Sequence, residues 1–306
     1  MTDQYDILRK IARGEAISDS KFHRRLVDEF GLEVTIGDSD LRLETPLELL
    51  DPDRLMKLIK PAAQSQLSRL DIHWTLDSTN RYVLDLATSA EFHGYACLAE
   101  RQTSGRGRRG RNWVSPFGKN IYLSMGWSLP ADQPLDGLSL AIGTCVARAI
   151  ASVSQVKVNL KWPNDVLLNN GKAGGILVEI AGGSANTRRL VIGVGINLSL
   201  SSSDAGSIDQ PWSVVENVSR NELVAALVTE ISTGLDDFSQ LGFEPFRGAW
   251  QALDAHEGQE VSIVSNDFAQ TGISLGINEL GNLMLETSEG VKVFNAGEVS
   301  LRSASR

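Results

Sequence analysis

Residues 156–180, VKVNLKWPNDVLLNNGKAGGILVEI, decide the fold. Asn170 and Gly171 form a two-residue signal for a tight β-hairpin turn, because both residue types accept a positive φ at little cost. The turn places the strand that contains Lys161 antiparallel to a strand that begins near Gly174. The sheet is therefore at least partly antiparallel, which separates it from the parallel sheet of a Rossmann fold.

Three predicted strands in and after this stretch share one asymmetry. One face of each is apolar, and we expect it to pack under helices. Its residues are Val156, Val158 and Leu160, then Ile176, Val178 and Ile180, then Ile192, Val194, Ile196 and Leu198. The opposite face is polar or lacks side chains, and it carries Lys157, Asn159 and Lys161 on one strand and Gly193, Gly195 and Asn197 on another. We interpret this second face as the floor of a ligand site.

Helices and one further strand surround the hairpin. Ser78 is placed to cap a helix whose apolar residues, from Val83 to Ala90, share one face. Residues 121–129 alternate apolar and polar side chains, which is typical of a half-buried strand. Helical spacing of apolar residues predicts helices over residues 135–153 and 220–253. The fold class is therefore α+β, with a mixed, largely antiparallel sheet and helices on one face.

A small module precedes this body. Residues 5–13 and 19–30 predict two short helices, the second opening at Ser18 or Asp19 and ending before Gly31. Alternation in residues 32–43 around a turn predicts a hairpin, so the module carries a wing.

Residues 46–60 would link this first module to the body. A second small module follows the body, where short alternating runs over residues 258–302 predict a small β-barrel. The expected domains are residues 1–60, 61–255 and 256–306.

Composition limits the function classes. The chain has 306 residues and 42% hydrophobic content, enough for one large core and smaller modules. A net charge of −9 argues against a protein whose main task is to coat nucleic acid. Cys97 and Cys145 lie in apolar stretches, which indicates buried thiols in a reducing compartment. No signal sequence or membrane-spanning run is evident, so we expect a cytoplasmic protein.

The most unusual segment is residues 105–111, GRGRRGR, which follows the apolar strand at residues 95–99. Arginine and glycine clusters are usually solvated charge runs. This one lies inside a compact body, between Gln102 and Trp113, which favours a specific anion site. Glycines let the backbone wrap closely around a ligand, and arginines bind carboxylate or phosphate oxygens with planar, permanently charged groups.

Two lysines lie near this predicted floor. Lys161 ends a strand before Pro163, on the polar face, where a lone lysine would otherwise be a solvated charge. Lys172 precedes Gly174 and Gly175, which allow close backbone approach, although this lysine could equally be a hairpin charge. Trp113 offers a flat surface for an adenine ring, or it is an ordinary core aromatic.

Six segments in this order resemble the biotin protein ligase family, in particular its bifunctional members with an N-terminal winged helix-turn-helix. The resemblance runs from Asp77 to Arg302. Its carriers are residues 77–80 (DSTN), 102–110, 161–165 (KWPND), 172–179 (KAGGILVE), 193–197 (GVGIN) and 300–302 (SLR). It implies a class II synthetase-like catalytic domain, a shortened winged-helix module and a small SH3-like C-terminal barrel.

The resemblance also implies roles for residues. Biotin contacts are expected from Ser78, Thr79, Asn80, Gln102, Arg106, Gly107, Arg108 and Lys161. The ATP or adenylate side is expected to hold Arg109, Arg111, Trp113, Asn164, Asp165, Lys172, Asn197 and Arg302. Lys161, Arg106 and Arg108 are the catalytic candidates, because a carboxylate that attacks the α-phosphorus of ATP needs fixed cations where two anions meet. We expect no protein-held metal, and Mg²⁺ should arrive with the nucleotide phosphates.

The expected reaction makes biotinyl-5′-AMP and pyrophosphate, then transfers biotin to a lysine of a biotin carboxyl carrier protein. A repressor role on DNA is disfavoured, because two helices precede Gly31 where three are needed, and residues 1–45 hold seven Lys/Arg against ten Asp/Glu. A lipoate or octanoate ligase is a third hypothesis, against which the polar site at residues 78–80 and the arginine segment favour biotin. The sequence leaves dimerisation and the identity of the acceptor open.

Overall fold

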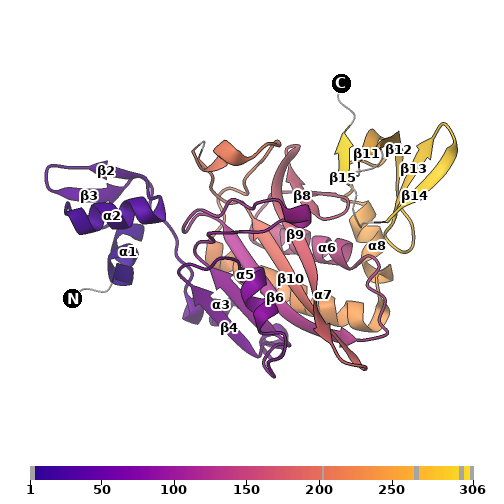
Figure 1. The fold of residues 1–306 in the computed structure, drawn as a ribbon, viewed down its shortest axis with the longest axis horizontal. Coiled ribbons are helices and arrows are strands. Elements are labelled where there is room, and N and C mark those ends of the chain that lie inside the picture. The colour runs from indigo at the N-terminus through magenta and orange to yellow at the C-terminus, as the bar shows by residue number, and fades with distance from the viewer. Residues whose placement is uncertain (1–3, 202, 265–268, 296–299, 304–306) are drawn as a thin grey trace.

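The computed structural model describes residues 4–201, 203–264, 269–295 and 300–303. Within these ranges three sheets follow one another along the chain, a small one near the N-terminus, a large central one and a five-stranded one near the C-terminus (Figure 1). The α+β class predicted from the sequence is confirmed.

The central sheet has seven strands in the order β4-β5-β6-β10-β9-β8-β7. Their bounds are β4 Arg69–His73, β5 Tyr95–Ala99, β6 Ile121–Pro130, β7 Asn159–Lys161, β8 Asp165–Leu168, β9 Gly171–Gly183 and β10 Thr187–Ile196. Only the pair β4–β5 is parallel among these neighbours, so the sheet is mixed and largely antiparallel, as predicted.

The turn that joins β8 to β9 lies one residue earlier than predicted. Leu168 pairs with Gly171, so the two turn residues are Asn169 and Asn170, with φ values of 49° and 64°. Asparagine tolerates this left-handed region, which a two-residue hairpin turn requires at both positions. Gly171 serves another purpose, because a β-carbon there would lie 2.6 Å from the carbonyl carbon of Trp212.

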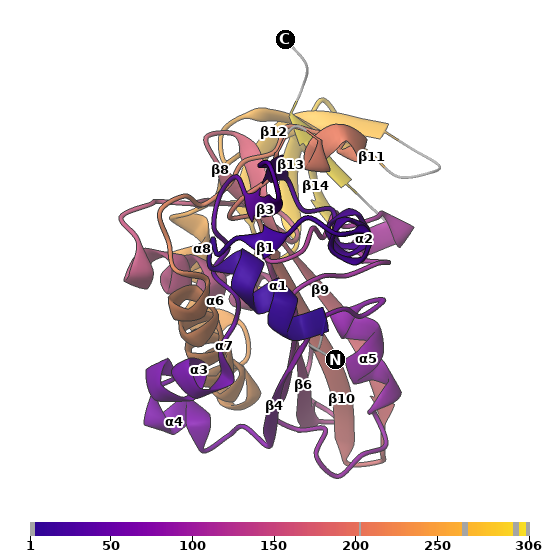
Figure 2. The same cartoon turned by 90° about the vertical axis from the view of Figure 1, so that its left-hand side faces the viewer.

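Helices cover both faces of the central sheet. Helices α6 (Leu138–Val153), α7 (Arg220–Leu241) and α8 (Glu244–Gln251) form a layer on one face, and the short α5 (Thr79–Asp85) lies on the other (Figure 2). The helix predicted after Ser78 is α5, but it ends at Asp85 and lies on the face opposite to the other helices, so the helices do not all lie on one face as predicted. Because of α5, β6 is buried on both sides rather than half-buried. Residues 220–253 form two helices instead of one, since Gly242 (φ 68°) ends α7.

The predicted apolar face holds for β7 and β10 but fails at one end of β9. Ile180 is 65% exposed, whereas Ile176 is buried. β9 continues past Ile180 to its turn with β10, where the strand leaves the helical layer and meets solvent. Periodicity alone gives the face of a strand but not the point where its cover ends.

The N-terminal module consists of α1 (Gln4–Ala12), β1 (Ile17–Ser18), α2 (Lys21–Phe30), β2 (Val34–Ile36) and β3 (Asp40–Leu43). Ser20 caps α2, since its hydroxyl accepts a hydrogen bond from the His23 amide at 3.1 Å. The predicted cap at Ser18 or Asp19 is wrong, because Ser18 lies in β1 and pairs with Asp40. Gly31 ends α2 with φ 62°, as predicted.

The segment predicted as a linker belongs to the body. It contains α3 (Pro52–Leu58), α4 (Pro61–Gln64) follows it, and both pack on α7. Leu50, Leu55 and Ile59 are part of the large core between the central sheet and its helices.

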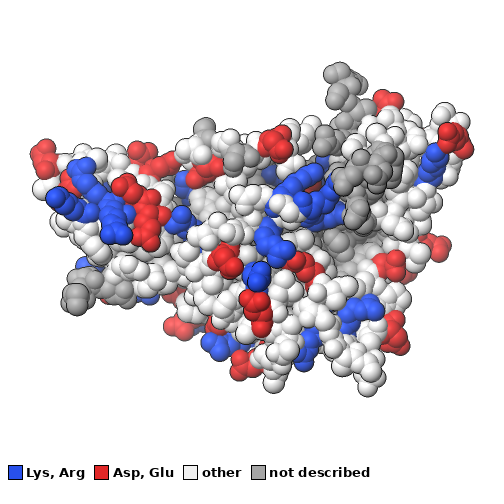
Figure 3. All heavy atoms as spheres, viewed as in Figure 1, with Lys and Arg blue, Asp and Glu red and all other residues white. Residues whose placement is uncertain are grey.

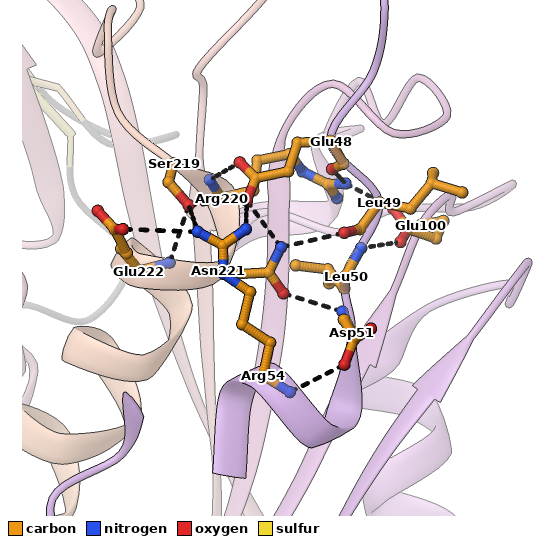
Figure 4. Close-up of polar contacts among 10 residues, drawn as sticks. All are labelled: Glu48, Leu49, Leu50, Asp51, Arg54, Glu100, Ser219, Arg220, Asn221 and Glu222. Carbon is orange, nitrogen blue, oxygen red and sulfur yellow. Dashed lines mark hydrogen bonds and ion pairs between the residues drawn. The ribbon is translucent and has the colours of Figure 1, made fainter. Parts of the chain in front are cut away.

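Buried polar contacts fasten this segment to the start of α7 (Figure 4). Arg220 and Glu100 form an ion pair at 2.7 Å, with side chains 5% and 4% exposed. The other Glu100 oxygen accepts from the Leu50 amide at 2.6 Å, and Arg220 also donates to the carbonyl of Glu48 at 2.6 Å. Asn221 accepts from the Asp51 amide at 2.9 Å. These contacts thus hold residues 48–51 to the end of β5 and to the start of α7.

The C-terminal sheet has the order β14-β13-β12-β11-β15. Its strands are β11 Glu260–Val264, β12 Ala269–Ile277, β13 Leu283–Thr287, β14 Gly290–Phe294 and β15 Ser300–Ser303. Within the described ranges β14 and β15 form the two edges, so the predicted barrel is an open sheet. The Trp162 indole donates to the Gly281 carbonyl at 3.0 Å and connects this sheet to the body.

Cys97 and Cys145 are free and buried, as predicted, and burial raises the pKa of the Cys145 thiol to about 12. In the part of the chain that the structure describes, no helix is both long and apolar enough to cross a bilayer.

Candidate active site

A cavity of about 780 Å³ opens between the central sheet, the arginine segment and the start of the C-terminal sheet. Fourteen of the sixteen residues predicted to bind biotin or nucleotide line it. They are Ser78, Thr79, Asn80, Gln102, Arg106, Gly107, Arg108, Arg109, Arg111, Trp113, Lys161, Asn164, Asp165 and Lys172. The arginine segment and Lys161 therefore face one space, although 50 or more residues separate them in the sequence.

Two predicted residues stand apart. Asn197 is buried behind the cavity, where its amide donates to the carbonyls of Lys172 at 3.2 Å and Ser213 at 3.3 Å. It supports the strand ends instead of lining the space. The backbone of Arg302 pairs with Ser262 in the C-terminal sheet, and its side chain lies outside the described residues.

Glycines shape the floor as the sequence predicted. A β-carbon at Gly195 would lie 2.6 Å from the Trp113 indole, and one at Gly175 would lie 3.2 Å from the same ring. Only glycine lets the indole approach the sheet this closely. Gly193 provides the same room for Asn80, whose side-chain oxygen would lie 2.1 Å from a β-carbon there.

The arginine segment forms a compact hairpin over this floor. Arg106 bridges to Asn112, and the Gly107 amide donates to the Arg111 carbonyl at 2.8 Å. Arg109 has φ 58°, a left-handed conformation that costs energy outside glycine. The Trp113 amide donates to the Gly105 carbonyl at 2.9 Å, which closes the hairpin. The segment is therefore folded and not a solvated charge run.

The cavity is strongly cationic. Among the described residues, six Lys or Arg line it against two carboxylates, Asp165 and Asp209, in a chain whose net charge is −9. Figure 3 shows Lys and Arg side chains gathered at the centre of one face, near the ends of β8 and β9. Burial lowers the pKa of Arg108, and the neighbouring Arg109 and Arg111 add to this effect while Asp165 opposes it. Such a site favours an anionic ligand that relieves the repulsion.

Two arginines are held by protein acceptors. Arg106 pairs with Glu179 at 3.2 Å, and Arg108 donates to the side-chain oxygen of Asn164 at 3.1 Å. Asn164 in turn donates to the Ile176 carbonyl at 2.8 Å. These contacts orient the guanidinium groups toward the floor before any ligand binds.

The start of α5 forms the opposite wall. Ser78 caps the helix by accepting from the Arg81 amide at 3.5 Å. Gln102 accepts from the Thr79 amide at 2.8 Å and donates to Ser115 at 3.0 Å. Helix N-termini and hydroxyl groups offer donors and acceptors for a polar ring.

Lys172 lies between the floor and the strand β8. It pairs with Asp165 at 2.6 Å, and its ammonium lies 5.5 Å from the centre of the Trp113 ring. At this distance the cation is attracted by the face of the indole. Trp113, Asp165 and Lys172 thus form one end of the cavity, separate from the start of α5.

His256 lies beside Lys161 where the body meets the C-terminal sheet. Burial lowers the pKa of His256 to about 4, and the charge of Lys161 acts in the same direction. The imidazole is therefore neutral near pH 7 and adds no positive charge beside Lys161.

Comparison with known proteins places this cavity in a family. The model of the biotin/lipoate A/B protein ligase family matches residues 73–197, and that of the biotin protein ligase C-terminal domain matches residues 256–302. The bifunctional ligase/repressor BirA of Escherichia coli is 36% identical over 290 residues, which cover 93% of this chain and 88% of the relative. The chain belongs to the biotin protein ligase family. The resemblance seen in its motifs is confirmed.

Further members of the biotin protein ligase family agree. The biotin–[acetyl-CoA-carboxylase] ligase of Paracoccus denitrificans is 33% identical over 73% of this chain and 96% of its own length. The solved biotin protein ligase of Aquifex aeolicus, in complex with biotin and ATP, has a TM-score of 0.63 and 29% identity and covers 77% of this chain and 99% of its own.

The sequence missed several lining residues. Asp209, Gln210 and Pro211 come from the loop after β10, while His256 and Gln259 come from the start of the C-terminal sheet. None of these positions belongs to a motif or a periodic pattern, so no local signal marks them. Ser124 and Glu179 support lining residues from the sheet. Ser124 looked like an ordinary polar residue of an alternating strand, and Glu179 ended the motif at residues 172–179 without a role of its own.

Proposed function

We propose that this chain joins biotin to a lysine of an acceptor protein in two steps. Biotin and ATP first form biotinyl-5′-AMP and pyrophosphate, and the acceptor amine then attacks the carbonyl of this mixed anhydride and releases AMP. The observation that carries the proposal is the joint lining of one cavity by Arg106, Arg108 and Lys161 over a polar floor. The biotin and ATP named in the Aquifex aeolicus complex support it.

The cavity divides by chemistry. The start of α5 supplies hydroxyl, amide and backbone groups that suit the ureido ring of biotin. Trp113 supplies a flat surface at the other end, where Lys172 and Asp165 lie, and this end suits adenine and phosphate. Biotin would lie with its carboxylate toward Lys161, between the two ends.

Fixed cations make the first step feasible. The biotin carboxylate and the α-phosphate are both anionic, so their approach needs positive charge that is already in place. Lys161 and Arg108 provide it at the boundary between the two ends. The hairpin of residues 105–113 covers the adenylate and excludes water, which protects the anhydride from hydrolysis.

Magnesium fits this site as an ion carried by the nucleotide. Asp165 and Asp209 are the carboxylates that line the cavity, and Lys172 already holds one of them. Mg²⁺ prefers phosphate, carboxylate and water oxygens, so it would neutralise part of the triphosphate charge while it keeps much of its water shell.

The acceptor is proposed to be a biotin carboxyl carrier domain, since the Paracoccus denitrificans relative is named for acetyl-CoA carboxylase.

DNA binding is not proposed. Although the match to the bifunctional BirA covers 93% of this chain, Arg24 of α2 is paired with Asp19 at 2.5 Å, which takes one cation away from a duplex. Specific, salt-sensitive retardation of a biotin-operon fragment would reverse this view.

Biotin-dependent exchange of pyrophosphate into ATP tests the first step, with lipoate and octanoate as competing acids. Lys161→Gln should lower the exchange rate by about 100-fold or more, because it removes a cation from the reacting centre. Lys157→Gln is the matched control, since this lysine is exposed and lies outside the cavity. Equal rates in the two variants, or exchange supported by lipoate in place of biotin, would contradict the proposal.

A further inference from the structure

We propose that Glu179 and Ser124 are positioning residues of the biotin subsite, which together fix the polar atoms that biotin meets. This inference rests on the proposed function and adds two residues that do not themselves line the cavity. Glu179 lies on β9 and Ser124 on β6, on either side of β10. Both reach Asn80 on α5, which does line it.

Glu179 holds the floor and the arginine segment at the same time. One carboxylate oxygen accepts from the Asn80 amide nitrogen at 2.9 Å, and the other pairs with Arg106 at 3.2 Å. A carboxylate is an acceptor only, so the nitrogen of Asn80 must face Glu179. The oxygen of Asn80 is then left to face Ser124.

Ser124 fixes the direction of the remaining hydrogen bonds. It is fully buried, with its oxygen 2.5 Å from the Asn80 oxygen and 2.8 Å from the Thr79 hydroxyl. A hydroxyl carries one proton, and the Asn80 oxygen can only accept, so Ser124 donates to Asn80. The Thr79 hydroxyl also carries one proton, and both Ser124 at 2.8 Å and the Gln102 oxygen at 3.1 Å lie within its reach.

The result is a hydrogen-bonded chain of one polarity that ends on the Glu179 carboxylate. It runs from Ser124 to Asn80 and then to Glu179, where Arg106 joins from the other side, and the Thr79 hydroxyl contacts it at Ser124. Gln102 links Thr79 to the end of the hairpin, because its oxygen accepts from the Thr79 amide at 2.8 Å and its nitrogen donates to Ser115, which donates to the Trp113 carbonyl at 2.9 Å. The start of α5, the floor of the sheet and the arginine segment are thus held in fixed positions relative to one another at the biotin end of the cavity.

The Arg106–Glu179 pair alone would contribute little, since the two side chains are 45% and 22% exposed. Its importance is that the same carboxylate orients a buried amide. A neutral side chain of the same shape has one acceptor oxygen where Glu179 uses two. Such a side chain must lose either the hydrogen bond from Asn80 or the pair with Arg106. If it loses the bond from Asn80, its amide nitrogen faces the amide nitrogen of Asn80, and two donors then oppose each other.

Glu179→Gln is therefore the test, with Glu244→Gln as the matched control, because Glu244 forms an ion pair with Arg247 at 3.0 Å and neither residue lines the cavity. Calorimetry should give a biotin Kd about ten-fold higher for Glu179→Gln, consistent with the loss of a hydrogen bond to a charged acceptor. The KM for ATP should stay within about two-fold. A merely structural role would weaken both ligands and lower Tm.

Ser124→Ala provides a second, independent variant. It should raise the biotin Kd by a similar factor. The biotin Kd of the double variant should be at most about two-fold higher than that of either single variant, because both changes break the same chain of hydrogen bonds. Additive losses in the double variant, an unchanged biotin Kd, or a lower Kd in Glu179→Gln would overturn the inference. If the unaltered protein itself binds no biotin, the proposed function fails instead.

Discussion

Removal of Arg220 should destabilise the fold strongly. Its guanidinium pairs with Glu100 at 2.7 Å in a region where both side chains are 95% buried or more, and it also donates to the Asn120 carbonyl at 2.9 and 3.2 Å. In Arg220→Leu, Glu100 would keep one described donor, the Leu50 amide. A buried charge that loses its partner costs about 3–5 kcal/mol.

Thermal unfolding at pH 7 measures this cost. A loss of this size lowers Tm by about 10 °C in a chain of this length. Arg54→Leu is the matched control, because Arg54 pairs with Glu48 at 2.9 Å while its side chain is 46% exposed, and exposed pairs contribute about 1 kcal/mol or less. Arg220→Leu combined with Glu100→Leu should recover part of the lost stability, since no charge is then left unpaired. Equal Tm values for the two single variants would refute the reasoning.

Two further predictions concern the cavity. Gly195→Ala should raise the ATP Kd about ten-fold, because the new β-carbon would lie 2.6 Å from the Trp113 indole and must displace it, whereas Gly248→Ala, with open space around it, should change nothing. His256→Gln should reduce the loss of stability on acidification. The folded-state pKa of His256 is lowered to about 4, so its contribution is present above the unfolded value of 6.5 and is lost as pH falls toward 4. Tm values at pH 7 and 4.5 should therefore differ less in the variant than in the parent, and an equal difference would contradict the assigned burial effect.

Local patterns in the sequence predicted most of the fold. The alternation in β6, β7 and β10 and the asparagine-rich turn specified an antiparallel sheet, because these signals depend on neighbouring residues alone. The failures occur where distant segments decide. Ile180 is exposed because the helical layer ends before it, and the supposed linker is a helix because α7 offers it an apolar surface.

The same distinction applies to the site. Arginines, glycines and Lys161 could be predicted because unusual residue types stand close together or at a strand end. Asn197 was placed in the cavity from its face on a strand, yet its amide is used by the carbonyls of Lys172 and Ser213. The roles of Ser124 and Glu179 arise from contacts among β6, β9, α5 and the arginine segment, which no local pattern contains.

The central claim is that one cationic cavity activates biotin and passes it to a protein amine. Mass spectrometry of a biotin carboxyl carrier domain, incubated with this chain, biotin and ATP, tests it most directly. The account predicts one added biotinyl group on a single acceptor lysine, dependent on ATP and strongly reduced in Lys161→Gln. An acceptor of unchanged mass with the folded, unaltered chain would contradict it.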